Sequence, residues 1–149
     1  MCGYTVAPSV ANPVLYRIGF TASGKMNTLK DSSSLTLANS ATSAACSPMA
    51  ELRTATGKDQ LFVSVQNGCL ASGGGTGGCI MSFDITTGFP AASSAARPEA
   101  GGTSGIVVDN ISSAAQASNI YFTTLSDTTC GDALSGGGCA VKLTQTGLN

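Results

Sequence analysis

Two pairs of cysteines each enclose a glycine-rich loop, and this arrangement constrains the fold more than any other feature of the chain. Cys69 and Cys79 flank one loop, and Cys130 and Cys139 flank the other. When the two ends of a loop lie side by side, their Cα atoms approach the distance of about 5.5 Å that a disulfide needs. We therefore expect two antiparallel hairpins, each with a disulfide across the base of its loop.

The remaining cysteines, Cys2 and Cys46, are paired only by elimination, so this third disulfide stays open. Zinc is a competing role for the six cysteines, but a four-thiolate site uses cysteines two to four residues apart within each pair. A nucleophilic thiolate at Cys2 or Cys46 is another alternative, although the chain contains no histidine to activate it. Disulfides are therefore the interpretation that we favour.

The cysteine usage also points to a compartment. An even number of cysteines in a chain with only 10% charged residues is typical of oxidising environments. Met1 is followed at once by Cys-Gly-Tyr-Thr, without the basic and apolar segments of a signal peptide. We expect a mature chain or, as we favour, a piece of a longer extracellular or periplasmic protein.

An internal repeat organises the chain. Comparison of the sequence with itself finds a unit of about 59 residues twice, in which Glu51 aligns with Asp109. A third, partial copy opens the chain, because 15–24 aligns with 79–88. We divide the chain into a partial repeat and two full repeats, with the bounds 1–45, 46–100 and 101–149.

Each repeat reads as short β-strands separated by turns. Alternating apolar and polar residues occupy short runs such as 61–65, 79–85 and 120–125, and turn-forming residues follow them. The Ser/Ala/Pro-rich stretches 27–45 and 89–102 read as connections, with a short outer strand expected at 35–38. We predict an all-β, propeller-type fold of two blades and a partial one, with a β-sandwich as the alternative.

The segments 61–65, 78–88, 101–110, 120–125 and 138–141 are together similar to a family of uncharacterised secreted bacterial repeat proteins. That resemblance covers most of the chain, and it implies a β-propeller-like fold within the C-terminal part of a longer extracellular protein. It implies no activity.

Composition excludes several functions. A chain without histidine cannot use a Ser-His-Asp or Cys-His mechanism, and it cannot supply histidine ligands to zinc or haem. The formal net charge of −1 offers no footprint for nucleic acid or for an anionic membrane surface. We therefore expect neither of these partners.

Three residues form the one candidate metal site. Glu51 and Asp109 stand near the end of the first strand of each repeat, and Asn110 follows directly. The first strand of a propeller blade lines the central channel, where such oxygens could hold a divalent cation such as calcium. Paraoxonase- and gluconolactonase-like propellers resemble this arrangement, and they hold a metal for the hydrolysis of lactones, esters or phosphotriesters. The competing interpretation is that each residue is only a polar group at a strand end.

Two functions follow as expectations. The first is a structural or ligand-binding module of an extracellular propeller, with a small-molecule ligand that the sequence does not identify. The second is a metal-dependent hydrolase, with its site in the channel or at a subunit interface. Two repeats and a fraction cannot bury all of their sheet faces, so we also expect a homo-oligomer.

Overall fold

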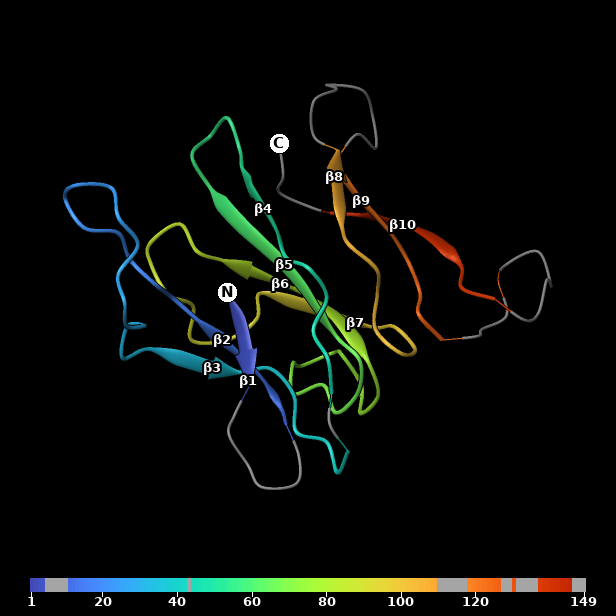
Figure 1. Ribbon diagram of the computed structural model, residues 1–149. Helices are drawn as coiled ribbons and strands as arrows, with labels where there is room; N and C mark the ends of the chain where they lie inside the picture. The colour runs from blue at the N-terminus through green and yellow to red at the C-terminus, as the bar shows by residue number, and fades with distance from the viewer. Residues whose placement is uncertain (5–10, 43, 110–117, 127–129, 131–136, 146–149) are drawn as a thin grey trace.

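The computed structural model describes residues 1–4, 11–42, 44–109, 118–126, 130 and 137–145, and all of its regular structure is β-strand (Figure 1). The expected all-β class is therefore confirmed. Within the described residues, no helix is long and apolar enough to span a bilayer. The ten strands are β1 (Cys2–Tyr4), β2 (Pro13–Tyr16), β3 (Ser34–Thr36), β4 (Ala50–Arg53), β5 (Asp59–Val65), β6 (Cys79–Asp84), β7 (Ala95–Pro98), β8 (Val107–Asp109), β9 (Asn119–Thr123) and β10 (Ala140–Thr144).

These strands form three small antiparallel sheets, and every hydrogen-bonded pair joins strands that are consecutive in the chain. The first sheet has the order β1-β2-β3, the second β4-β5-β6-β7 and the third β8-β9-β10. Each sheet lies within one of the three predicted repeats, although the repeat boundaries themselves stay a prediction. The strand β7 lies within 89–102, which we had predicted to be a connection without a strand.

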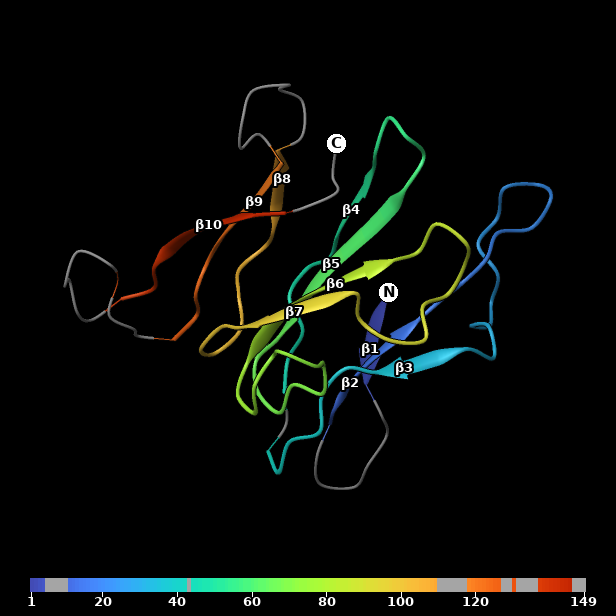
Figure 2. The same ribbon diagram turned by 180° about the vertical axis from the view of Figure 1, so that it is seen from behind.

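The three sheets follow one another in space, with the second between the other two (Figures 1 and 2). Successive residues of a strand point to opposite faces, so Phe62 and Val63 of β5 serve two different cores. Val63 packs against Leu15 of the first sheet, while Phe62 packs against Ile120 of the third sheet. The second sheet is thus covered on both faces. The sheets do not close into a ring, and the predicted propeller blades are not confirmed.

All six cysteines form disulfides, in the three predicted pairs. Cys69–Cys79 and Cys130–Cys139 close the two glycine-rich loops, with Cα–Cα distances of 5.9 and 5.5 Å. Cys2–Cys46, with a Cα–Cα distance of 6.7 Å, joins the first sheet to the segment that leads into β4. No cysteine is left free, so the zinc and thiolate alternatives fall away. Three disulfides fit an oxidising environment.

The glycine next to each second cysteine is required by packing. A Cβ atom on Gly78 would lie 2.6 Å from the carbonyl oxygen of Gln66, and one on Gly138 would overlap the carbonyl oxygen of Thr124. Both contacts involve backbone, which cannot move aside cheaply. The backbone therefore crosses itself closely at the same place in the second and third sheets.

The second and third sheets also begin with the same hydrogen bonds. The hydroxyl of Ser47 accepts a hydrogen bond from the amide of Ser64, and the hydroxyl of Ser104 accepts one from the amide of Thr123. Each serine amide in turn donates to the carbonyl oxygen of the same partner. These repeated contacts fix which residues of the two sheets correspond.

Candidate functional site

Glu51 lies in β4, directly opposite Leu61 of β5. Leu61 packs against the core between the first and second sheets, so Glu51 is on the face turned toward the first sheet. Its exposed side chain lines a cavity of about 330 Å³, to which Leu15, Arg17 and Phe89 also contribute. The guanidinium of Arg17 is paired with a carboxylate other than Glu51, that of Asp31.

Asp109 is the last residue of β8 and lies opposite Asn119 of β9. Its neighbour Val108 packs into the core between the second and third sheets, which places Asp109 on the face turned away from the second sheet. Asn119 is buried, and its side-chain oxygen accepts a hydrogen bond of 2.9 Å from the hydroxyl of Thr144. Asn110 lies outside the described residues.

The strand register corrects the alignment by which Glu51 and Asp109 were matched. Ala50 pairs with Phe62, and Val107 pairs with Tyr121 at the corresponding rung of the third sheet. The residue that corresponds to Glu51 is therefore Val108, one position before Asp109. A shift of one residue moves a side chain to the opposite face of its sheet. Glu51 and Asp109 consequently lie on different faces of their sheets.

A metal site at these positions accordingly has no geometric support in the part of the chain that is described. There, no three Asp, Glu, Cys or His side chains gather closely enough to hold a metal ion. The predicted calcium-type site at Glu51, Asp109 and Asn110 stays a prediction, with its third member outside this part.

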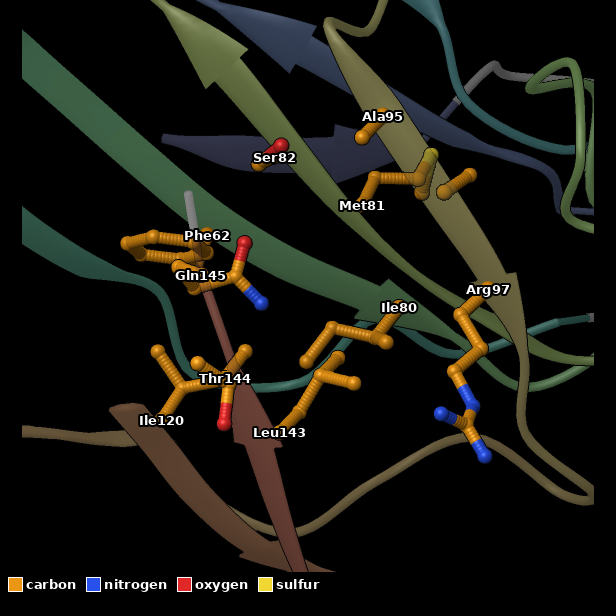
Figure 3. Close-up of a pocket in the computed structure, with 11 residues that line it drawn as sticks. Phe62, Ile80, Met81, Ser82, Ala95, Arg97, Ile120, Leu143, Thr144 and Gln145 are labelled. Carbon is orange, nitrogen blue, oxygen red and sulfur yellow. The ribbon is translucent and has the colours of Figure 1, made fainter. Parts of the chain in front are cut away.

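A cleft between the second and third sheets is the better candidate for a binding site (Figure 3). Its volume is about 230 Å³. The larger apolar side chains that line it come from both sheets and are those of Phe62, Ile80, Ile120 and Leu143. Apolar walls with a few polar groups at the rim are the usual construction of a small-molecule site.

Arg97 and Gln145 supply the two longest polar side chains of this cleft. Arg97 of β7 lies opposite Ile80 of β6, and Gln145 follows directly after β10. In Figure 3 the amide of Gln145 lies beside the ring of Phe62, while the guanidinium of Arg97 lies at the far side of the apolar wall. The cleft therefore presents a fixed positive charge at one side and an amide at the other.

The charge of Arg97 is balanced in part by a buried carboxylate. The Nε atom of Arg97 is 3.5 Å from a carboxylate oxygen of Glu99, whose side chain is 8% exposed, whereas that of Arg97 is 60% exposed. Burial raises the pKa of Glu99, and the charge of Arg97 acts in the opposite direction. The ion pair joins Glu99 to the Nε atom of the guanidinium.

The described residues that line the cleft supply polar groups for the binding of a ligand. Its lining groups include one guanidinium, one amide, and the hydroxyls of Ser82 and Thr144. A hydroxyl nucleophile needs a neighbouring base, and the lining residues include no carboxylate or other base near these hydroxyls. The cleft can therefore hold and orient a ligand.

The sequence contained no signal for this cleft. Arg97 stands in an Ala/Ser/Pro-rich stretch without strand periodicity, and Gln145 stands close to the end of the chain. The cleft exists because β7 pairs with β6, and only the tertiary structure shows this pairing.

Comparisons of the chain with family models, with curated proteins and with solved structures find no match. The resemblance to secreted bacterial repeat proteins consequently stays a prediction. The functional conclusion rests on the geometry of the cleft and on the stacking of the sheets.

Proposed function

We propose that this protein is a structural or ligand-binding module of an extracellular, β-propeller-type repeat protein. Its ligand, in this proposal, is a small molecule with an anionic group and an apolar body. The observation that carries the proposal is the position of Arg97, at the rim of a cleft between two sheets whose larger wall side chains are apolar. The three disulfides support the extracellular assignment.

The propeller-type assignment is supported by the way in which the sheets repeat. The second and third sheets begin with the same serine hydrogen bond and carry a disulfide loop between corresponding strands. Their first strands, β4 and β8, also contact each other. In a propeller the first strands of adjacent blades lie together around the axis, so this contact is the one expected between two blades.

The anionic group of the ligand follows from the chemistry of arginine. A guanidinium is planar and always charged, and its paired N–H groups match a carboxylate or a phosphate. Because the Arg97 side chain is largely exposed, water screens this charge, and we expect modest affinity. The apolar part of the ligand would lie against Ile80 and Leu143, which face the same cleft.

Thermal unfolding in the presence of small acids tests this proposal. Benzoate should raise the melting temperature in a concentration-dependent manner, whereas benzyl alcohol, which has a similar ring without the charge, should have a smaller effect. Arg97→Gln should remove the difference between the two compounds. Arg53→Gln is the matched control, because Arg53 is also an exposed, ion-paired strand residue but lies outside the cleft. Equal responses of Arg97→Gln and the unmodified protein to benzoate would overturn the assignment.

The metal-dependent hydrolase is distinguished by a separate assay. It requires turnover of an ester or lactone that is lost with a chelator and in Glu51→Gln or Asp109→Asn. The binding module requires no turnover, and its response to benzoate should be the same with and without chelator. Chelator-sensitive hydrolysis would therefore replace the binding proposal by the enzymatic one.

A further inference from the structure

The third sheet has an exposed face, on the side away from the second sheet, which we call the outer face. It consists of one residue or more from each of its three strands, namely Val107, Tyr121, Thr123, Ala140 and Lys142. Val107 is 64% exposed, although it is a large apolar side chain. A shallow groove of about 410 Å³ runs over these residues.

The outer face corresponds, position by position, to a face that is buried elsewhere in the same chain. Tyr121 occupies the place that Phe62 has in the second sheet, because both pair with the first strand at the same rung. Phe62 is 1% exposed beneath the third sheet, whereas Tyr121 is 36% exposed. The outer face is thus the stacking face of a β-sheet, without a sheet upon it in the described part of the chain.

The first sheet presents the complementary face at the other end of the series. Tyr16 pairs with Ser34 in that sheet, and Met81 pairs with Ala96 at the corresponding rung of the second sheet. Met81 is in the core between the first and second sheets, so its face is the one that receives the preceding sheet. The face of the first sheet that carries Val14, Tyr16, Ser34 and Thr36 therefore corresponds to a receiving face, on which Val14 is buried and Ser34 and Thr36 are exposed.

The correspondence at this end is supported by backbone contacts. The amide of Leu37 donates to the carbonyl oxygen of Pro13, just as the amide of Glu99 donates to the carbonyl oxygen of Gly78. In both sheets the donor of this hydrogen bond is the residue directly after the last strand, β3 or β7. The first and third sheets consequently carry faces that correspond to the two halves of an interface that the chain forms twice internally.

We propose that the outer face of one copy packs against the Tyr16 face of a second copy, head to tail. This proposal goes beyond ligand binding, and it does not depend on the Arg97 cleft. Both faces include polar groups, since Lys142 lies beside Tyr121 on one and the ammonium of Lys30 lies 4.8 Å from the centre of the Tyr16 ring on the other. We expect weak association, because faces of this composition exclude water less completely than the two internal cores.

Sedimentation velocity on the oxidised protein over a wide concentration range is the test. The unmodified protein should show a sedimentation coefficient that increases with concentration. Tyr121→Glu on the outer face and Thr36→Glu on the Tyr16 face should each remain monomeric. Thr36 is already exposed and polar, so its substitution leaves folding intact even if Tyr121→Glu does not fold. Met26→Glu is the matched control, because Met26 is 60% exposed and lies beyond the end of β2, on neither face.

Mixing the two variants distinguishes head-to-tail packing from a symmetric dimer. A mixture of Tyr121→Glu and Thr36→Glu contains one intact face of each kind, so it should form dimers that neither variant forms alone. A monomeric unmodified protein at every concentration would overturn the proposal. So would Thr36→Glu that associates as well as the unmodified protein, since two outer faces would then pair with each other.

Discussion

Ser47 and Ser64 hold the beginning of the second sheet together through two hydrogen bonds that run in opposite directions. The amide of Ser64 donates to the hydroxyl of Ser47 at 3.0 Å, and the amide of Ser47 donates to the carbonyl oxygen of Ser64 at 2.9 Å. Ser104 and Thr123 repeat both bonds in the third sheet, at 3.0 and 2.8 Å. In each sheet, the serine hydroxyl takes the place of a backbone carbonyl as the acceptor for a strand amide, at the point where the chain enters the sheet.

Removal of either hydroxyl should therefore have the same consequence. Ser47→Ala and Ser104→Ala each leave one backbone amide without an acceptor, and each should lower the free energy of unfolding by about 1–3 kcal/mol. Urea denaturation measures both. Ser23→Ala, in an exposed turn, is the control and should change stability by less than about 0.5 kcal/mol. A large loss in only one of the two variants would contradict the equivalence of the sheets.

Two adjacent glycines should differ sharply in their tolerance of a methyl group. A Cβ atom on Gly78 would contact the carbonyl oxygens of Glu99 and Gln66, whereas one on Gly77 would meet nothing within 4 Å. Gly78→Ala should destabilise the protein by about 1–3 kcal/mol or more, and Gly77→Ala should be close to neutral. Thermal unfolding of the two variants measures the difference, and equal melting temperatures would refute the close approach.

The disulfides should contribute unequally, in the order of the loops that they close. Cys2–Cys46 spans 44 residues and Cys130–Cys139 spans 9. In the chain-entropy model, replacing the first pair by alanine should lower stability by about 4 kcal/mol and replacing the second by about 2.5 kcal/mol. Urea denaturation of the two double variants under oxidising conditions measures this order. The reverse order would show that local strain or packing outweighs chain entropy.

Glu99 should make stability depend on pH. Burial raises its pKa above the ordinary value of 4.5, so the folded protein binds this proton more tightly than the unfolded chain does. The resulting stabilisation is fully present below pH 4.5 and is lost as the pH rises through the folded-state pKa. Glu99→Gln stays neutral, so its stability relative to the unmodified protein should increase from pH 4 to pH 7. Denaturant midpoints at both values measure this change.

Asp84 provides a control of opposite sign. Hydrogen bonds from the hydroxyl and the amide of Thr86 lower the pKa of Asp84 below its ordinary value of 3.8. Its contribution to stability is therefore present above that pH and is lost as the pH falls through the folded-state pKa. Asp84→Asn should lose stability relative to the unmodified protein at pH 7, the direction opposite to Glu99→Gln. The same sign for both variants would contradict the burial of Glu99.

The sequence alone predicted the strand class and the disulfides, because both have local signals. Alternation marks strands such as β5, and the glycine loop between Cys69 and Cys79 requires a hairpin whatever the rest of the fold. The pairing of Cys2 with Cys46 was reached only by elimination, since the two are 44 positions apart in the sequence and nothing local brings them together.

The sequence alone did not predict the register of the strands. Short strands with period 2 can be aligned one residue apart without a visible penalty. This shift aligned Glu51 with Asp109, whereas the strand registers make Val108 the equivalent of Glu51. The cleft at Arg97 was missed for a related reason. The strand β7 is composed of small residues and forms because β6 offers an edge to it, not because its own sequence favours a strand.

The meander connection of every sheet has a consequence for synthesis. Since each strand pairs only with its neighbours in the chain, a sheet needs no residue from a later sheet in order to form. The ribosome releases the chain from the N-terminus, so the first sheet can assemble while the second is still being made. Leu15 and Leu35 of the first sheet then stay exposed until the second sheet forms, because Val63 and Met81 of the second sheet complete their core. Apolar side chains exposed in this way make a partly synthesised chain prone to aggregation.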